Sequence, residues 1–340
     1  MRIVSVISFV IWAQFDFCGA TFGKIEPGAL CQIVAPLSPG FGSTEEQLVS
    51  AVQEFGLTPL INSYIYNVSG PDPLYPWYSN SDEFRAEDLL SAILNPDVKV
   101  IWLVNGGSGA YRTLDHLSAM LPPPPLLIAP KPIIGFSAAT PIFTFLQQKY
   151  NWTGIVHGAV LDLIVWGYYE NSTEITIEPL KDLLFGNADN KITLPVLRRI
   201  DNGAHFDVPL VANVTGGSIR QTVLSMGTSY KLNATNKILF LEISERTADS
   251  VNDFIDALLF SGTFDGVKAI LFGDFMADRN DPPTFVEWIL HRLAKERRVK
   301  APIFRVNGLG HDTTNHPIPF NTPVAITHDS DSMYSLTVKF

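Results

Sequence analysis

Short apolar runs alternate with amphipathic segments along the first half of this 340-residue chain. The runs at 32–36 (QIVAP), 98–104 (VKVIWLV) and 132–136 (PIIGF) contain few polar residues, as expected for strands covered on both faces. Residues 82–94 place apolar side chains at helical spacing, and another helix is expected after Ser137. This βα alternation predicts an N-terminal α/β domain of the Rossmann or flavodoxin-like type, with a parallel sheet between layers of helices. An earlier helix is expected to begin with a capping box formed by Ser43 and Glu46.

The second half of the chain predicts a smaller C-terminal α+β domain. It opens with a strand, an expected glycine turn at Gly216-Gly217 and a helix, and it ends in short strands. The segments 237–243 (KILFLEI) and 267–275 (VKAILFGDF) have the composition of buried strands. Periodicity is weak between 168 and 202, so the linker is expected there. The predicted division is a signal peptide at 1–20, an N-terminal domain at 21–170, a linker at 171–205 and a C-terminal domain at 206–340.

The first 20 residues have the features of a secretory signal. Arg2 provides a positive charge, and the apolar run at 3–13 is shorter than the ~20 residues that span a bilayer. A buried N-terminal strand is the alternative. No later segment is long and apolar enough to cross a membrane, so a secreted protein is expected, periplasmic if the source is bacterial. Five Asn-x-Ser/Thr sequons agree with a secreted glycoprotein, at Asn67, Asn151, Asn171, Asn213 and Asn233.

Charge and composition exclude several classes of protein. A net charge of −10 argues against a nucleic-acid partner, because phosphate binding needs a basic surface. With 46% hydrophobic and 17% charged residues, the chain is not disordered. It contains neither HExxH nor CxxC, so no metal site is expected. Cys31, the one cysteine left after signal removal, lies in an apolar stretch and is interpreted as a core residue, and His157 and His316 are interpreted as structural or supporting residues.

Polar residues suited to nucleophilic catalysis follow several of the predicted strands. Ser137 lies between a buried strand and a helix, where a sharp turn can hold its hydroxyl outward. The loop at 105–109 (NGGSG) has backbone N–H groups that could stabilise an oxyanion. Glu242 follows the apolar run ILFL, and His311 lies in a glycine-flanked loop. The simpler alternatives are a serine N-cap, a plain glycine turn, a rim ion pair and an ordinary loop histidine.

Seven motifs, taken in order, resemble the LD-carboxypeptidase family of serine peptidases, which includes the microcin C self-immunity peptidases. GGSGAYR is similar to the family's G-G-Y-G-x-x-R loop, and PKPIIGFSAAT to its P-K-x-x-I-G-x-S-D-x-T elbow. LFLEISE resembles L-x-L-E-D-x-x-E, and GLGHDTTNHPIP resembles G-x-x-H-x-x-x-N-x-x-x-P. The other three are IVAPLSP, RAEDLLSAILNPDVKVIW and GGSIRQTVLSMGT.

The resemblance implies a catalytic triad of Ser137, Glu242 and His311. Ser137 would attack the carbonyl, His311 would move the proton, and Glu242 would orient the imidazole. Backbone N–H groups of Gly107 and Ala138 would form the oxyanion hole. The full set assigned to the oxyanion hole or to substrate binding is Gly106, Gly107, Ser108, Ala138 and Gly217.

The resemblance also implies a substrate class and an assembly. Family members remove a terminal D-alanine from peptidoglycan tetrapeptides, or cleave peptidyl- and aminoacyl-nucleotide analogues, as homodimers without a cofactor. We therefore expect a secreted serine hydrolase that cuts an L,D-amide bond in peptides of bacterial cell-wall origin. The alternatives are an amidase that acts on nucleotide conjugates and an inactive protein that binds muropeptides.

Four positions depart from the family pattern. Ala138 and Ile243 each replace an Asp, Asn105 replaces an Arg, and Ser108 replaces an aromatic residue. None of these departures removes a member of the implied triad. We expect all four to lie close enough to the implied site to alter substrate choice.

Overall fold

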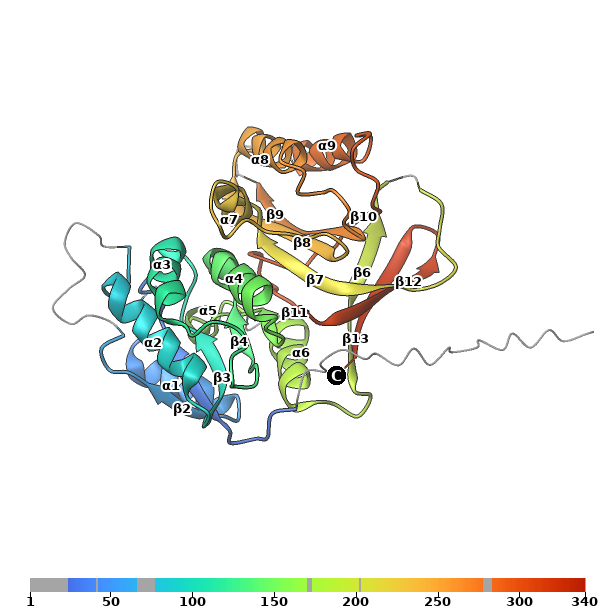
Figure 1. Cartoon of the computed structure of the whole chain (residues 1–340). Helices are drawn as coiled ribbons and strands as arrows, with labels where there is room; N and C mark the ends of the chain where they lie inside the picture. The colour runs from blue at the N-terminus through green and yellow to red at the C-terminus, as the bar shows by residue number, and fades with distance from the viewer. Residues whose placement is uncertain are drawn as a thin grey trace, which may run out of the picture.

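The computed structural model describes residues 24–40, 42–65, 77–169, 173–201, 203–277 and 283–339. The expected signal peptide and the sequons at Asn67 and Asn171 lie outside these ranges. The described chain forms a six-stranded sheet and a separate closed barrel (Figure 1). The predicted α/β fold with a distinct C-terminal domain is therefore confirmed. Within the described ranges, no helix combines the length and hydropathy needed to cross a bilayer.

The N-terminal sheet has the strand order β11-β5-β4-β3-β1-β2. Its first five strands along the chain are parallel, and β11 pairs antiparallel with β5 at the edge. Because parallel strands share one carboxyl edge, the loops that follow β1, β3 and β4 meet there. The bounds are β1 (Leu30–Val34), β2 (Thr58–Ile61), β3 (Val98–Leu103), β4 (Ile133–Gly135), β5 (Ile155–His157) and β11 (Ile318–Phe320).

Helices cover this sheet and begin with local caps. The N-cap Ser81 of α2 accepts a hydrogen bond from the Phe84 N–H, and the helix ends before Pro96. The capping box of α1 uses Thr44 and Gln47, so the predicted pair was displaced by one residue. Ser43 instead donates its hydroxyl to Asp162 of α5. The bounds are α1 (Glu45–Glu54), α2 (Asp82–Leu94), α3 (Ala110–Met120), α4 (Thr140–Tyr150) and α5 (Leu161–Val165).

The barrel closes in the order β10-β6-β13-β12-β7-β8-β9. Its strands β7, β8, β9 and β10 pair in parallel, and its other pairings are antiparallel. The helices α7 (Ile219–Ser225), α8 (Ala248–Phe260) and α9 (Pro283–Leu293) lie together on one side of it (Figure 1). The strand bounds are β6 (Lys191–Arg199), β7 (Leu210–Ser218), β8 (Ile238–Arg246), β9 (Ala269–Ala277), β10 (Ile303–Arg305), β12 (Pro323–Ser330) and β13 (Met333–Lys339).

The segment expected as a linker contains regular structure. Residues 171–205 include the helix α6 (Thr173–Phe185) and the strand β6, which is one of the strands that form the barrel. Pro179 within α6 weakened the helical signal in the sequence. The domain boundaries at 170 and 205 stay a prediction.

The expected glycine turn at Gly216-Gly217 is instead the end of a strand. Both glycines belong to β7, with φ angles of +126° and +124°. A Cβ atom at Gly216 would lie 1.9 Å from the carbonyl oxygen of Phe240 on β8. The absence of a side chain at Gly216 therefore allows β7 to lie this close to the β8 backbone.

Candidate active site

Ser137 lies on a sharp turn between β4 and α4. Its φ angle is +59°, a conformation that few residues other than glycine adopt. Neither this turn nor α4 has a side-chain cap hydrogen bond, so Ser137 does not act as the N-cap. A Cβ atom at Gly106 would lie 3.2 Å from the Ser137 Cβ, which shows how closely the glycine loop approaches the serine. This geometry matches a strained turn that exposes a nucleophile.

Thr140 links the serine turn to the barrel. Its Oγ1 donates to the Ser137 carbonyl oxygen at 2.7 Å and accepts from the Ser218 N–H at 3.0 Å. A Cβ atom at Gly217 would lie 2.5 Å from this oxygen. Gly217 therefore has a packing role, since only a residue without a side chain allows this contact.

Glu242 and His311 form a hydrogen-bonded pair. The Nδ1 of His311 lies 2.5 Å from the Glu242 Oε2, and the Glu242 side chain on β8 is fully buried. The Phe136 ring packs against the imidazole, with ring centres 4.7 Å apart. Because Nδ1 faces the carboxylate, Nε2 is left for an exchange of protons with a hydroxyl.

A second histidine lies on the other side of the Glu242 carboxylate. The Nε2 of His157, on β5, lies 3.9 Å from the Glu242 Oε1. Burial would raise the pKa of Glu242, but the His311 and His157 rings outweigh it and hold the pKa at about 2. Burial also lowers the pKa of His157, which favours its neutral form. Its place beside Glu242 agrees with the supporting role expected from the sequence, and His316 is buried against Pro317 with its pKa lowered to about 4 by burial.

The glycine loop is held against the segment that follows β1. The Ser38 Oγ accepts from the Ser108 N–H at 2.9 Å, and the Ser38 N–H donates to the Gly106 carbonyl oxygen at 3.2 Å. Gly107 has a φ angle of +90°, and a Cβ atom there would lie 2.0 Å from the Ser38 Oγ. The Ser108 N–H is therefore occupied by Ser38 and is not directed at a substrate.

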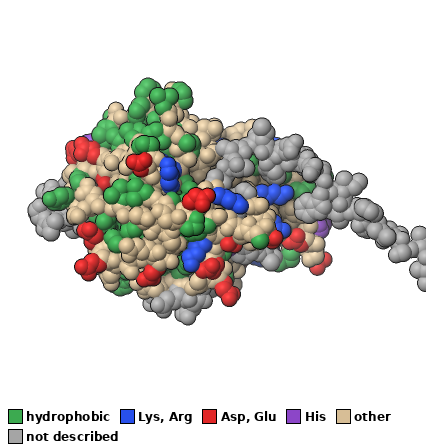
Figure 2. All heavy atoms as spheres, turned by 90° about the horizontal axis from the view of Figure 1, so that it is seen from below, with side chains coloured by type: hydrophobic (Ala, Val, Ile, Leu, Met, Phe, Trp, Pro, Cys, Tyr) green, Lys and Arg blue, Asp and Glu red, His purple; other side chains and the backbone are tan. Residues whose placement is uncertain are grey.

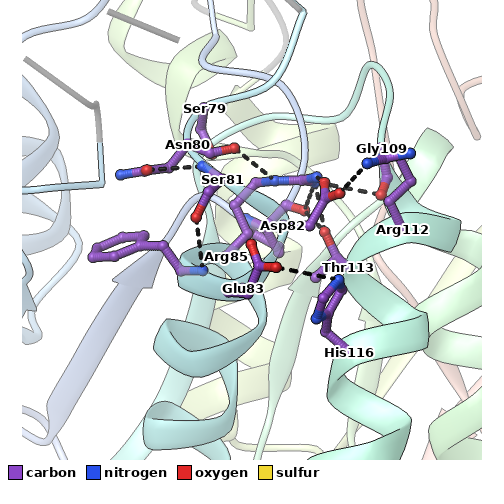
Figure 3. Close-up of polar contacts among 12 residues, drawn as sticks. Ser79, Asn80, Ser81, Asp82, Glu83, Arg85, Gly109, Arg112, Thr113 and His116 are labelled. Atoms are coloured by element: carbon purple, nitrogen blue, oxygen red, sulfur yellow. Dashed lines mark hydrogen bonds and ion pairs between the residues drawn. The ribbon is translucent and has the colours of Figure 1, made fainter. Parts of the chain in front are cut away.

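Arg85 ties this loop to two other segments (Figure 3). Its buried guanidinium donates to the carbonyl oxygens of Pro36 (2.8 Å), Gly109 (3.3 Å) and Asn80 (3.2 Å). It also donates to Thr113 at 2.5 Å and pairs with Asp82. The Arg85 side chain therefore holds together the three segments that contain Pro36, Asn80 and Gly109, each of which reaches the cavity described below. The sequence did hold a signal for this role, because Arg85 shares the buried stripe of α2 with residues 89 and 92.

The His311 loop is anchored by a buried carboxylate on β9. Asp274 accepts the Gly308 N–H at 3.0 Å, and its own N–H donates to the Leu309 carbonyl oxygen at 2.7 Å. A Cβ atom at Gly310 would lie 3.2 Å from Glu242 and 3.3 Å from Asp274. Burial raises the pKa of Asp274 to about 6, and sequence reasoning gave no indication of this residue.

A cavity of about 650 Å³ opens over these groups, between the carboxyl edge of the sheet and the barrel. Trp77, Tyr168, Arg220 and Arg246 form part of its wall, and no described lining residue is Asp or Glu. Of the residues expected from the sequence, it is lined by Ser137, His311, Gly106 and Gly107. Glu242 lies behind His311, Ala138 is buried beside the serine, and Ser108 and Gly217 contact protein groups. Among the residues that the structure describes, no three His, Cys, Asp or Glu side chains are arranged to hold a metal ion.

Two family models match the chain in succession. Residues 32–158 match the LD-carboxypeptidase N-terminal domain, and residues 211–326 match the LD-carboxypeptidase C-terminal domain. The protein RP402 of Rickettsia prowazekii (strain Madrid E), which carries the name of a carboxypeptidase, is 27% identical over 264 residues, 78% of each chain. A protein of Bacillus subtilis (strain 168), named as a murein peptide carboxypeptidase, is 22% identical over 89% of this chain and 90% of its own.

Solved structures share the fold. An MccF-like protein from Bacillus anthracis superposes with a TM-score of 0.74 at 20% identity, covering 93% of this chain and 98% of that one. The muramoyltetrapeptide carboxypeptidase from Oxalobacter formigenes gives 0.66 at 17% identity, covering 92% of this chain and 99% of that one. The microcin C7 self-immunity protein MccF, in complex with aspartyl sulfamoyl adenosine, gives 0.68 at 16% identity over 93% and 97%. The chain belongs to the LD-carboxypeptidase family of serine hydrolases.

Proposed function

We propose that this protein removes the terminal D-alanine from peptidoglycan-derived peptides by hydrolysis of an L,D-amide bond. The observation that carries the proposal is that Ser137 and His311 line the same cavity, while the buried Glu242 carboxylate is hydrogen-bonded to His311 Nδ1. Ser137 Oγ attacks the carbonyl while His311 Nε2 takes its proton, and Glu242 stabilises the imidazolium through Nδ1. The backbone N–H groups of Gly107 and Ala138 are proposed to receive the negative charge on the carbonyl oxygen.

The ionisation state of Glu242 favours this chemistry. A Glu242 pKa of about 2 keeps the carboxylate charged throughout the neutral range. An ionised acceptor on Nδ1 holds the imidazole in the tautomer that presents a lone pair at Nε2. Protonated His311 can then pass its proton to the leaving amine of D-alanine.

Release of free D-alanine from a defined L,D-tetrapeptide tests the proposal. The purified chain is expected to release one D-alanine per peptide and to leave the tripeptide. Ser137→Ala should reduce the rate by at least ~10³-fold without loss of folding, because members of a triad act as a unit. Ser118→Ala, on the outer helix α3, should retain full activity. Absence of D-alanine release by folded wild-type protein would refute the proposal.

The second candidate is an amidase that acts on aminoacyl- or peptidyl-nucleotide conjugates. The shared fold of MccF, which was solved with aspartyl sulfamoyl adenosine, favours it. Direct competition between an L,D-tetrapeptide and an aspartyl-adenylate analogue distinguishes the two activities. A kcat/KM at least tenfold higher for the peptide supports the first proposal, and the reverse ratio supports the second. An inactive muropeptide-binding protein would cleave neither substrate.

We further propose that the protein is exported and forms a homodimer. Export would bring the protein to wall-derived peptides. Cleavage after about Ala20 is expected, so a retained Met1 in the natural protein would argue against export.

On the face drawn in Figure 2, Lys and Arg side chains lie among Asp and Glu side chains, as on many protein surfaces in water. Light scattering measures the oligomeric state directly.

A further inference from the structure

Arg220 occupies a distinctive position in the cavity wall. It is half-buried and is the second residue of α7, which directly follows the Gly216–Ser218 end of β7. It forms no hydrogen bond or ion pair with any residue that the structure describes, whereas the neighbouring Arg246 does have a partner. A half-buried guanidinium that lacks an anion in its own chain is suited to an anion from a ligand.

The backbone around Arg220 is fixed relative to the nucleophile. The Ser218 N–H donates to Thr140 Oγ1, and Thr140 Oγ1 donates to the Ser137 carbonyl oxygen. On the other side, the Tyr111 hydroxyl donates to the Gln221 carbonyl oxygen at 2.7 Å. Two elements of the N-terminal domain therefore hold the segment that carries Arg220.

The side chains that line the cavity favour a negatively charged ligand. Arg220, Arg246 and His311 line the cavity, and no described lining residue carries a carboxylate, although the chain has a net charge of −10. An arginine binds a carboxylate through two parallel hydrogen bonds, which fix direction as well as charge. The scissile bond of a carboxypeptidase substrate lies one residue from a free carboxylate.

We propose that Arg220 binds the terminal carboxylate of the leaving D-amino acid and thereby restricts the site to substrates with a free carboxyl end. This assignment rests on the proposed carboxypeptidase function. It makes Arg220 the residue that separates release of one terminal residue from cleavage inside a longer peptide. Arg246, four residues after Glu242 on β8, serves as the internal comparison.

The test uses two tetrapeptides that differ only at the end, one with a free carboxylate and one with a terminal amide. For the wild type, kcat/KM should be ~10–100-fold higher for the free acid, the usual effect of one charged hydrogen-bonded pair. Arg220→Gln should reduce kcat/KM for the free acid by that factor and leave the amide within about twofold. Arg220→Lys should keep part of the preference, because lysine retains the charge without the two-pronged geometry. The exposed Arg298→Gln removes the same charge elsewhere and should preserve the wild-type ratio.

Binding to the Ser137→Ala protein provides a readout that does not depend on hydrolysis. The free acid should bind ~10–100-fold more tightly than the amide, and Arg220→Gln in this background should abolish the difference. Equal affinity for the two peptides, no binding of either, or a difference that depends on Arg246 alone would overturn the assignment. Stronger binding of adenosine monophosphate through Arg220 would assign the residue to phosphate and also overturn it. Peptide binding that depends on Arg220, without D-alanine release by the wild type, would refute only the proposed function.

Discussion

Asp274 shows how a single buried group can shape the site without facing the cavity. It accepts a hydrogen bond from the loop that carries His311, yet its second carboxylate oxygen has no hydrogen-bond partner among the described residues. Glu242 and Asp312 add negative charge nearby, and Arg305 partly offsets it. The carboxylate therefore orders the loop at some cost to stability.

The pKa of Asp274 predicts a pH-dependent stability. Burial raises this pKa to about 6, so the folded protein binds the proton more strongly than the unfolded chain does. Stability is then lost as pH rises from about 4 to 6, and the cost persists above that range. Asp274→Asn keeps the acceptor for the Gly308 N–H but removes the charge. We expect this substitution to raise the free energy of unfolding at pH 8. The increase relative to wild type should be ~1–3 kcal/mol larger at pH 8 than at pH 4.

Urea unfolding at the two pH values provides the measurement. Asp115→Asn, at an exposed position on α3, is the matched control and should show little difference between them. An equal effect of Asp274→Asn at pH 4 and pH 8 would contradict the assigned cost of burial.

At the scale of elements, close approaches decide where strands and loops can lie. Gly216 brings β7 against β8 beside the residues that precede Glu242. Gly216→Ala would place a Cβ atom 1.9 Å from the Phe240 carbonyl oxygen and should destabilise the protein by at least ~3 kcal/mol. Gly227→Ala, where no atom lies within 4 Å of the added Cβ, should change stability by no more than ~0.5 kcal/mol. Thermal unfolding of both variants checks this difference, and equal stability would refute the close approach.

The three segments held by Arg85 give a second prediction at this scale. Arg85→Lys keeps the charge but cannot serve the Pro36, Asn80 and Gly109 carbonyl oxygens together. We expect a loss of ~2–4 kcal/mol in stability, because buried acceptors are left without donors. Arg112→Lys alters an exposed arginine that also pairs with Asp82 and should cost less than ~1 kcal/mol (Figure 3). Similar losses in the two variants would show that Arg85 does not hold the loops.

Local pattern was sufficient for most elements but not for contacts between distant segments. The helix expected at 82–94 matches α2, because its cap and its stop before Pro96 are both local signals. The Gly216-Gly217 pair was misjudged as a turn because the contacts that require its glycines lie on distant segments, Phe240 of β8 for Gly216 and Thr140 of α4 for Gly217. The order of strands around the barrel likewise depends on pairings that no local periodicity records. Within the site, the strand-to-helix position of Ser137 and the loop position of His311 were readable from the sequence. Glu242 was expected at the end of a strand but lies in the middle of β8, because the strand continues to Arg246. The roles of Arg220, Asp274 and Thr140 emerge only from the fold.

For the whole molecule, the site depends on both sheets at once. The serine turn and glycine loop come from the N-terminal sheet, and Glu242 and His311 come from the barrel side. The strand β11, which follows the His311 loop, returns to pair with β5, so the C-terminal part of the chain completes the N-terminal sheet (Figure 1). The register places Ile318 opposite His157, the neighbour of Glu242. Assembly of the site is therefore coupled to the joining of the two parts.

Reaction with a fluorophosphonate tests the central claim, that Ser137 is activated by His311 and Glu242. A serine reacts rapidly with this probe only when a base and an oxyanion site are both in place. Peptide mass spectrometry of the wild type should find one modified residue, Ser137, and His311→Ala should reduce the labelling rate by at least ~10³-fold. Ser137→Ala should not be labelled. Modification of a different residue, or no modification of folded wild-type protein, would contradict the account.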